Sequence, residues 1–258
     1  MVYAYFFLIL QQNLKLNMKT KTKFDIGEIP YDKMEPYGMS QEMVDDLPLS
    51  VMKKLLAGER TPALPWVVDG HESKARISLV RMEEGDVDVL VMPYAHHTNM
   101  EGFDEKQQVA LLQGDVILAD KGKGLAYYQL DDETNQIISC PKSVIDHNIG
   151  ILKQEMELGD SDAESITKGE IVTFLKDKGE VTYSIDLNNE NGIRMTKGNK
   201  YDVSLKEEKL PHYSFGIYGC WVNNDNGLSY VNEEDYTQEM QDAQGEVVQK
   251  AKQGGMHR

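Results

Sequence analysis

The sequence predicts an α+β protein with a small N-terminal helical head, duplicated helix-strand-turn-strand modules that form antiparallel sheet, and a C-terminal hairpin and helix. Three observations lead to this class. Apolar residues recur at helical spacing before Pro65, they alternate with polar residues after it, and one pattern of helix and hairpin occurs twice further on. The expected divisions are a disordered or mis-started tail (1–28), the helical head (29–62), an α+β region with an internal repeat (63–198), and a linker, hairpin and helix (199–258).

Glycines and cap residues indicate where the helices of the head and the strands after it begin and end. A short helix over 31–37 ends at Gly38, Ser40 is placed to cap the next helix, and a third helix over 49–56 ends at Gly58. Alternation then predicts strands at 66–68, 75–80 and 87–92, with a hairpin turn at 84–86. A helix follows from Asp104 to Gln113.

The internal repeat appears when the sequence is aligned with itself so that Gly114 falls on Gly169. The other equivalent pairs are Leu111 and Ile166, Val116 and Ile171, Lys121 and Lys176, Lys123 and Lys178, Gly124 and Gly179, Tyr128 and Tyr183, and Asp131 and Asp186. We therefore expect two related modules, at about 104–137 and 159–195, each built as helix, strand, tight turn and strand. The alternative is chance similarity, since unrelated hairpins share glycine turns and alternation.

A helix over 144–156 separates the modules, and the chain closes with a hairpin and a helix. The hairpin strands are expected at 213–222 and 228–231, and Asn232 is placed to cap a final helix from Glu233 to about Lys252. Tyr213, Phe215, Ile217 and Trp221 are expected on one strand face, packed against that helix. Base stacking on this face is the alternative interpretation.

Composition limits the classes of function. The chain has 258 residues and 27 Lys and Arg against 43 Asp and Glu, so its net charge is −16. This charge disfavours direct binding of nucleic acid, and a mean hydropathy of −0.50 excludes an integral membrane protein. Two cysteines cannot form a disulfide framework, which indicates a reducing compartment such as the cytoplasm.

The first residues contain an apolar run from Val2 to Leu10 that is too short to span a membrane. Only the terminal amine supplies positive charge before it, which does not favour a signal peptide. Met18 begins a segment typical of a cytoplasmic start, so we expect that an upstream start codon added residues 1–17.

Four lysines are the candidate contact residues of the surface. Lys121, Lys123, Lys176 and Lys178 lie in equivalent expected turns of an otherwise acidic protein, where they could contact a phosphate backbone or an acidic partner. The alternative is that turns favour polar residues for their own sake. Replacing all four with glutamate should weaken such a contact without unfolding the chain.

No residue pattern indicates catalysis, and no catalytic residue, metal ligand or cofactor is expected. His96 and His97 are adjacent and have no partners at zinc-ligand spacing. There is no Gly-x-Ser-x-Gly elbow, and neither Cys140 nor Cys220 has the basic neighbours of a reactive thiol. The stretch from Lys121 to Gly124 lacks the spacing of a phosphate-binding P-loop.

Several segments resemble domains of unknown function encoded on conjugative transposons and other mobile genetic elements of Bacteroidetes, which occur alone or fused to type IA topoisomerases. The segments are IPYDKMEPYGMSQEMV (29–44), KLLAGERTPALP (54–65), ARISLVR (75–81), FDEKQQVALLQGDVI (103–117), YYQLDDETNQI (127–137), YSIDLNNENGIRM (183–195) and YGCWVNNDNGLSYVNEEDYTQEM (218–240). They are structural signatures without an assigned catalytic residue, and this chain has no topoisomerase portion. The resemblance implies a mobile-element context.

These observations predict a non-enzymatic accessory protein that binds a protein partner, for which a basic DNA-processing enzyme such as a relaxase or topoisomerase is suited. The first alternative is a nucleic-acid-binding module that acts through the lysine tips. The second is an acidic mimic of nucleic acid that occupies a host defence protein. An unrecognised hydrolase is a further alternative.

Overall fold

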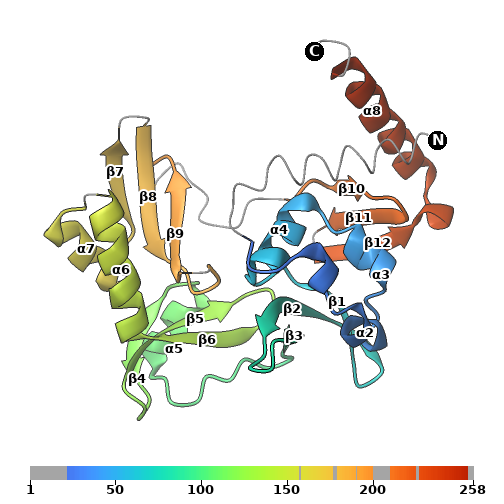
Figure 1. Ribbon diagram of the computed structural model, residues 1–258. Helices are drawn as coiled ribbons and strands as arrows, with labels where there is room; N and C mark the ends of the chain where they lie inside the picture. The colour runs from blue at the N-terminus through green and yellow to red at the C-terminus, as the bar shows by residue number, and fades with distance from the viewer. Residues whose placement is uncertain are drawn as a thin grey trace. The chain divides into compact units, whose positions relative to one another are not determined.

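The structure is a computed structural model that describes residues 22–156, 158–176, 179–189, 191–199, 210–224 and 227–254 (Figure 1). Helices and four antiparallel three-stranded sheets confirm the α+β class. The described residues form two compact units, which we call unit 1 (22–93 with 210–254) and unit 2 (94–199). The strands between residues 64 and 93 thus belong with the head and with the C-terminal part, whereas the sequence predicted a boundary between residues 62 and 63.

Short helices begin unit 1, in the order η1 (Ile26–Glu28), α2 (Tyr31–Met34), η2 (Glu35–Tyr37), α3 (Gln41–Asp45) and α4 (Leu49–Ala57). Ser40 caps α3 as expected, because its hydroxyl accepts a hydrogen bond from the Met43 N–H at 3.3 Å. Gly58 ends α4 in the left-handed conformation, with a φ of 74°. The helices bury Val51, Leu55 and their neighbours against the first sheet.

That first sheet has the order β1 (Leu64–Val68), β2 (His71–Arg81) and β3 (Val87–Pro93). Ala75, Ile77 and Leu79 alternate along β2 and are buried in one core with the head. This shared core is the physical reason why the head and these strands are one unit. Separating them would expose the apolar face of both.

The C-terminal sheet of unit 1 has the order β10 (Tyr213–Phe215), β11 (Gly219–Asn224) and β12 (Gly227–Asn232). A single strand was predicted over 213–222, which is wrong because the chain breaks at 216–218. A carboxylate of the helical head holds the chain in this break. The buried carboxylate of Asp46 accepts hydrogen bonds from the N–H groups of Ile217, Tyr218 and Gly219 at 2.6, 2.9 and 2.7 Å.

The break also separates the aromatic residues that were expected on one face. Phe215 pairs with Cys220 across the sheet and packs against Tyr236 and Met240, which begin the C-terminal helical part. Trp221 lies on the opposite face, is fully buried in the core of the head, and donates from its indole N–H to the Met43 carbonyl at 3.0 Å. The expectation of one aromatic face is therefore wrong.

The last helix begins later than the sequence indicated. A short turn, η3 (Glu233–Asp235), comes first, Tyr236 is extended, and α8 (Gln238–Gly254) follows. Tyr236 is only 9% exposed, so its burial beneath β10 interrupts the helical path. The Thr237 hydroxyl then accepts a hydrogen bond from the Met240 N–H at 3.3 Å.

Unit 2 consists of two modules, each a helix followed by a three-stranded meander. Module 1 contains α5 (Glu105–Leu112), β4 (Ile117–Asp120), β5 (Leu125–Asp131) and β6 (Gln136–Pro141). Module 2 contains α7 (Asp160–Thr167), β7 (Val172–Lys176), β8 (Gly179–Ile185) and β9 (Ile193–Lys197). Helix α6 (Lys142–Met156) joins them and contacts β5, β6 and β9. Each module therefore has a third strand beyond the predicted helix, strand, turn and strand, and the sequence does indicate β6 as a strand around Cys140 that Pro141 ends.

Equivalent residues of the two modules make equivalent hydrogen bonds. Gly114 donates to the Leu111 carbonyl at 3.0 Å and Gly169 donates to the Ile166 carbonyl at 2.9 Å, with φ values of 87° and 84°. Asp131 accepts from the N–H two residues later and from the Thr134 hydroxyl, and Asp186 accepts likewise from Asn188 and Asn189. The helix ends and the turns that follow β5 and β8 thus have corresponding hydrogen bonds in the two modules.

Candidate functional site

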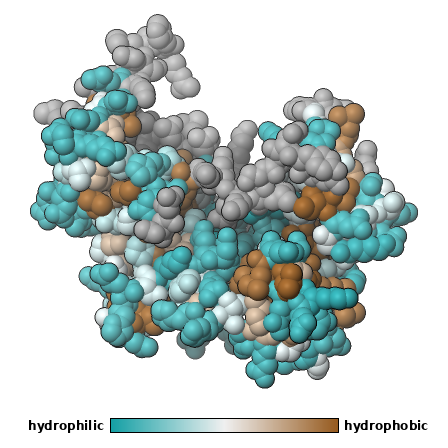
Figure 2. Space-filling model, turned by 180° about the vertical axis from the view of Figure 1, so that it is seen from behind, coloured by the Kyte–Doolittle hydropathy of each residue, from teal (hydrophilic) through white to brown (hydrophobic). Residues whose placement is uncertain are grey.

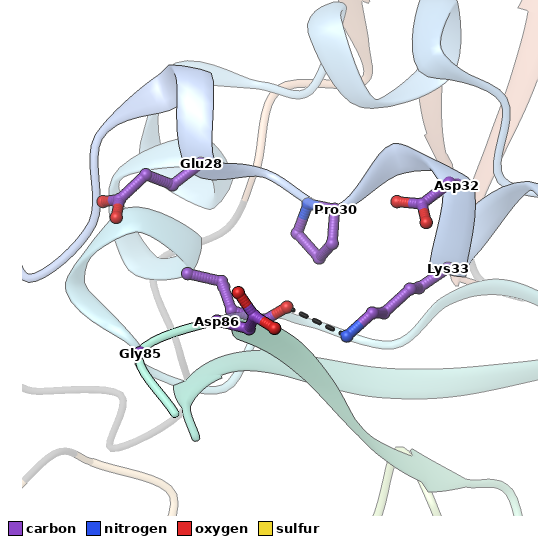
Figure 3. Close-up of a pocket in the computed structure, with 7 residues that line it drawn as sticks. Glu28, Pro30, Asp32, Lys33, Gly85 and Asp86 are labelled. Carbon is purple, nitrogen blue, oxygen red and sulfur yellow. Dashed lines mark hydrogen bonds between the residues drawn. The ribbon is translucent and has the colours of Figure 1, made fainter. Parts of the chain in front are cut away.

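A shallow concavity of about 320 Å³ lies in unit 1, between the first helical turns and the β2–β3 hairpin. Its lining residues are Glu28, Pro30, Asp32, Lys33, Gly85, Asp86 and Val87 (Figure 3). One side comes from η1 and α2, and the other comes from the turn that joins β2 to β3. Residues far apart in the sequence therefore meet at this surface.

Lys33 connects the two sides of the concavity. Its ammonium group donates to the Val87 carbonyl at 3.1 Å, the contact dashed in Figure 3, and forms an ion pair with Asp88 at 3.2 Å. The pKa of the Asp88 carboxyl is lowered, first by the hydrogen bond from the Val89 N–H and then by Lys33. The positive charge of Lys33 is therefore balanced within the chain.

Arg81 holds the opposite end of the concavity in the same way. Its guanidinium donates to the Gly85 carbonyl at 3.0 Å, pairs with Glu28 at 2.9 Å, and lies 5.3 Å from the centre of the Phe24 ring. The pKa of Glu28 is lowered by the hydrogen bond from the Asp25 N–H and by Arg81. Both basic groups of this surface thus have acidic partners.

The carboxylates of Asp32 and Asp86 remain without an ion pair among the described residues. Asp32 belongs to α2 and Asp86 to the hairpin turn, so the two acidic groups come from opposite sides of the concavity (Figure 3). Both residues are exposed. Negative charge that the chain does not balance can accept ammonium or guanidinium groups from a partner.

Of the four lysines at the tips, the structure describes the side chains of Lys121 and Lys123. Lys121 lies in the β4–β5 loop, but its ammonium group is 4.0 Å from the centre of the Phe103 ring and donates to the Glu101 carbonyl. Lys123 in the same loop is exposed and makes no hydrogen bond or ion pair within the described part of the chain. Lys178 lies outside the described residues, and Lys176 is placed only as the last residue of β7.

The two tips also differ in length. The last pair of module 1 is Asp120 with Leu125, which leaves a four-residue loop, whereas Lys176 pairs directly with Gly179 in module 2. Asp120 closes the longer loop, because its carboxylate accepts from the N–H groups of Gly122 and Gly124 at 2.8 and 3.1 Å. Leu175 occupies the equivalent position and has no such group.

The histidine and cysteine candidates, His96 and Cys220, lie in surroundings that indicate a packing role. His96 packs edge-on against Tyr94 at 5.9 Å, and the described ranges contain no group of three His, Cys, Asp or Glu that could hold a metal ion. Burial raises the pKa of the Cys220 thiol to about 11, so this cysteine is protonated at neutral pH. Of the helices in the described residues, none is long and apolar enough to cross a membrane.

Comparisons of this chain with protein-family models, with curated proteins and with solved structures find no match. The concavity itself could not be found from the sequence, because its ion pairs join residues more than fifty positions apart. The segment IPYDK and the turn after ARISLVR are both evident in the sequence, yet nothing in either pattern indicates that they meet.

Proposed function

We propose that this chain is a non-enzymatic accessory protein of a mobile genetic element, which acts in the cytoplasm by binding a basic protein partner in DNA processing or conjugative transfer. The unbalanced carboxylates of Asp32 and Asp86 on opposite sides of the concavity carry the proposal. A relaxase or topoisomerase has the basic surface that complements them. The resemblance to domains of conjugative transposons supports the mobile-element context.

Electrostatics across the whole chain supports the same partner class. With a net charge of −16, the long-range field attracts basic proteins and repels the phosphates of DNA. Figure 2 shows hydrophilic side chains over most of the face in view, with smaller hydrophobic patches between them. A surface of this kind suits a polar, salt-sensitive interface that forms and dissociates.

Binding to a purified relaxase and to a type IA topoisomerase of the same element tests the proposal. Titration at two salt concentrations should show complex formation that weakens as salt rises. The double variant Asp32→Asn with Asp86→Asn should bind about threefold to tenfold more weakly, since two opposing charges are lost. The matched control neutralises two exposed acids of unit 2, Glu105→Gln with Asp115→Asn, and should change affinity less.

Two results would contradict the proposal. Equal effects of both double variants would mean that the concavity has no special part in binding. Association with single- or double-stranded DNA that falls steeply with salt, and that Lys123→Glu abolishes, would instead favour the nucleic-acid module that acts through the lysine tips.

A further inference from the structure

The ammonium group of Lys121 occupies a notch in the surface of module 1. The notch is formed by the rings of Phe103 and Tyr128, whose centres lie 4.0 and 5.9 Å from the Lys121 nitrogen. The two rings meet edge to face, with centres 5.1 Å apart and an angle of 78° between their planes. A cation held against aromatic rings at these distances gains energy from their negative faces.

A hydrogen-bond acceptor completes the notch. The Glu101 carbonyl accepts from the Lys121 ammonium, and the lysine stem crosses directly over Gly102. A Cβ atom at Gly102 would lie 2.7 Å from Lys121 Cε, and the φ of this residue is 79°. Only glycine leaves both the space and the backbone conformation that this approach requires.

The notch does not depend on Lys121 for its shape. Phe103 is 6% exposed and packs in one cluster with Leu111 and Ala119, so the core of the module holds the ring. The β4–β5 loop is closed by the Asp120 carboxylate through Gly122 and Gly124. Removing the lysine side chain would therefore leave a preformed acceptor for a cation.

Module 2 shows that the fold of a module does not require this feature. Under the alignment that superposes Gly114 on Gly169, the residue equivalent to Phe103 is Leu158, which is 6% exposed and fills the same kind of buried position. The equivalent of Tyr128 is the fully buried Tyr183. An aliphatic residue therefore suffices to fill this position of the core. The aromatic ring of Phe103 is not needed for packing, and what it adds is a face that can bind a cation.

We propose that Phe103, Tyr128 and the Glu101 carbonyl form a binding site for the primary ammonium group of a lysine side chain, which Lys121 fills in the free chain. A lysine of the basic partner takes the place of Lys121 in the complex, and this exchange rests on the proposed function. Because the carbonyl needs a donor hydrogen, the site prefers a primary ammonium over a quaternary one. Displaced Lys121 remains on an exposed loop, where water solvates it.

Propylammonium is the probe that tests the site without any partner. Full-length Lys121→Ala protein is titrated while the backbone amide signal of Gly102 is followed by NMR, and the shift should saturate. Tetramethylammonium and propan-1-ol should give at least about threefold weaker binding, as should propylammonium added to the Lys121→Ala, Phe103→Leu double variant. Phe103→Leu copies the residue of module 2 and so keeps the core filled.

Whether Lys121 fills the site in the free chain is tested in the native protein and in the variant Lys123→Ala. The ring of Phe103 should move the Lys121 ε-proton signals upfield, and Lys123→Ala should leave them unchanged. A blocked Gly-Lys-Gly peptide should bind the Lys121→Ala protein at least about threefold more tightly than the native chain, because the tethered competitor is gone. The same peptide with norleucine in place of lysine should not bind.

The site is disproved if propylammonium gives no saturable shift in the Lys121→Ala protein, or if the Phe103→Leu exchange leaves its binding unchanged. Neither result depends on a relaxase or topoisomerase. Conversely, an intact ammonium site together with no binding of these enzymes would contradict the proposed function alone. The two proposals can therefore fail separately.

Discussion

The Asp46 carboxylate accepts a hydrogen bond from the Gly219 N–H at 2.7 Å, although the two residues are 173 positions apart. The same carboxylate accepts from two further backbone N–H groups and from the Tyr230 hydroxyl at 2.6 Å. Burial and Asp46 together raise the pKa of Tyr230, which keeps the phenol protonated as a donor. The Asp46 side chain of the head thus stabilises the interruption between β10 and β11.

Removing this carboxylate should destabilise unit 1. Asp46→Ala leaves buried donors unsatisfied and is expected to lower the free energy of unfolding by about 3–5 kcal/mol. Asp46→Asn should cost less, since one acceptor oxygen remains. Urea unfolding measures both effects, with the exposed Asp32→Asn as the control that should stay within about 0.5 kcal/mol. A change this small for Asp46→Ala would show that the break does not depend on Asp46.

Gly114 and Gly169 test whether the two modules are equivalent in energy as well as in hydrogen bonding. Each has a left-handed φ. A Cβ atom would meet open space at Gly114 and would lie in ordinary contact, at 3.4 Å, with the Val116 carbonyl oxygen at Gly169, so alanine should strain mainly the backbone. We expect Gly114→Ala and Gly169→Ala to cost about 1 kcal/mol each. Calorimetric unfolding of the two variants checks this. Costs that differ by more than about 1 kcal/mol would count against equivalent helix ends.

Local signals in the sequence predicted much of the fold. Ser40 caps α3 as the sequence predicted, because a capping side chain reaches only its own first turn. The helix ends at Gly114 and Gly169 are equally local. Such features depend on neighbours in the chain, and a single sequence contains those neighbours.

Long-range contacts account for what the sequence could not predict. The alternation of Tyr213, Phe215 and Ile217 favours one continuous strand, whereas the hydrogen bonds that the distant Asp46 accepts hold a break at 216–218. Lys121 and Lys123 look alike in the sequence and are both exposed, yet only the Lys121 ammonium group lies over the Phe103 ring among the described residues. The ion pairs of the concavity are of the same kind, because Lys33 and Arg81 find their partners only in the folded chain.

Tyr127 should make unit 2 less stable at high pH. Its hydroxyl donates to the Thr167 carbonyl, and burial, followed by the charge of Asp146, raises the pKa of the phenol to about 12. A raised pKa in the folded state means that the stabilisation is present below the unfolded value of about 10 and is lost as pH rises towards 12. The expected loss is about 2 kcal/mol over this interval.

The variant Tyr127→Phe isolates this effect. At neutral pH it should be less stable by about 1 kcal/mol, because the Thr167 carbonyl loses its donor. The difference between the native chain and the variant should shrink or reverse between pH 10 and 12, which unfolding followed by circular dichroism at several pH values measures. A difference that stays constant over this range would contradict the raised pKa.

Tryptophan fluorescence should report on unit 1 alone. The sequence has two tryptophans, and Trp66 and Trp221 are 3% and 0% exposed in the same core of unit 1. Ile166→Ala deletes fully buried apolar atoms from unit 2 and should cost about 2–5 kcal/mol there. Because both indoles belong to the core of unit 1, the fluorescence midpoint in urea should stay within error of the native value. Val51→Ala, at a buried position of unit 1, should lower that midpoint. A midpoint that Ile166→Ala lowers as well would show that the two units unfold as one.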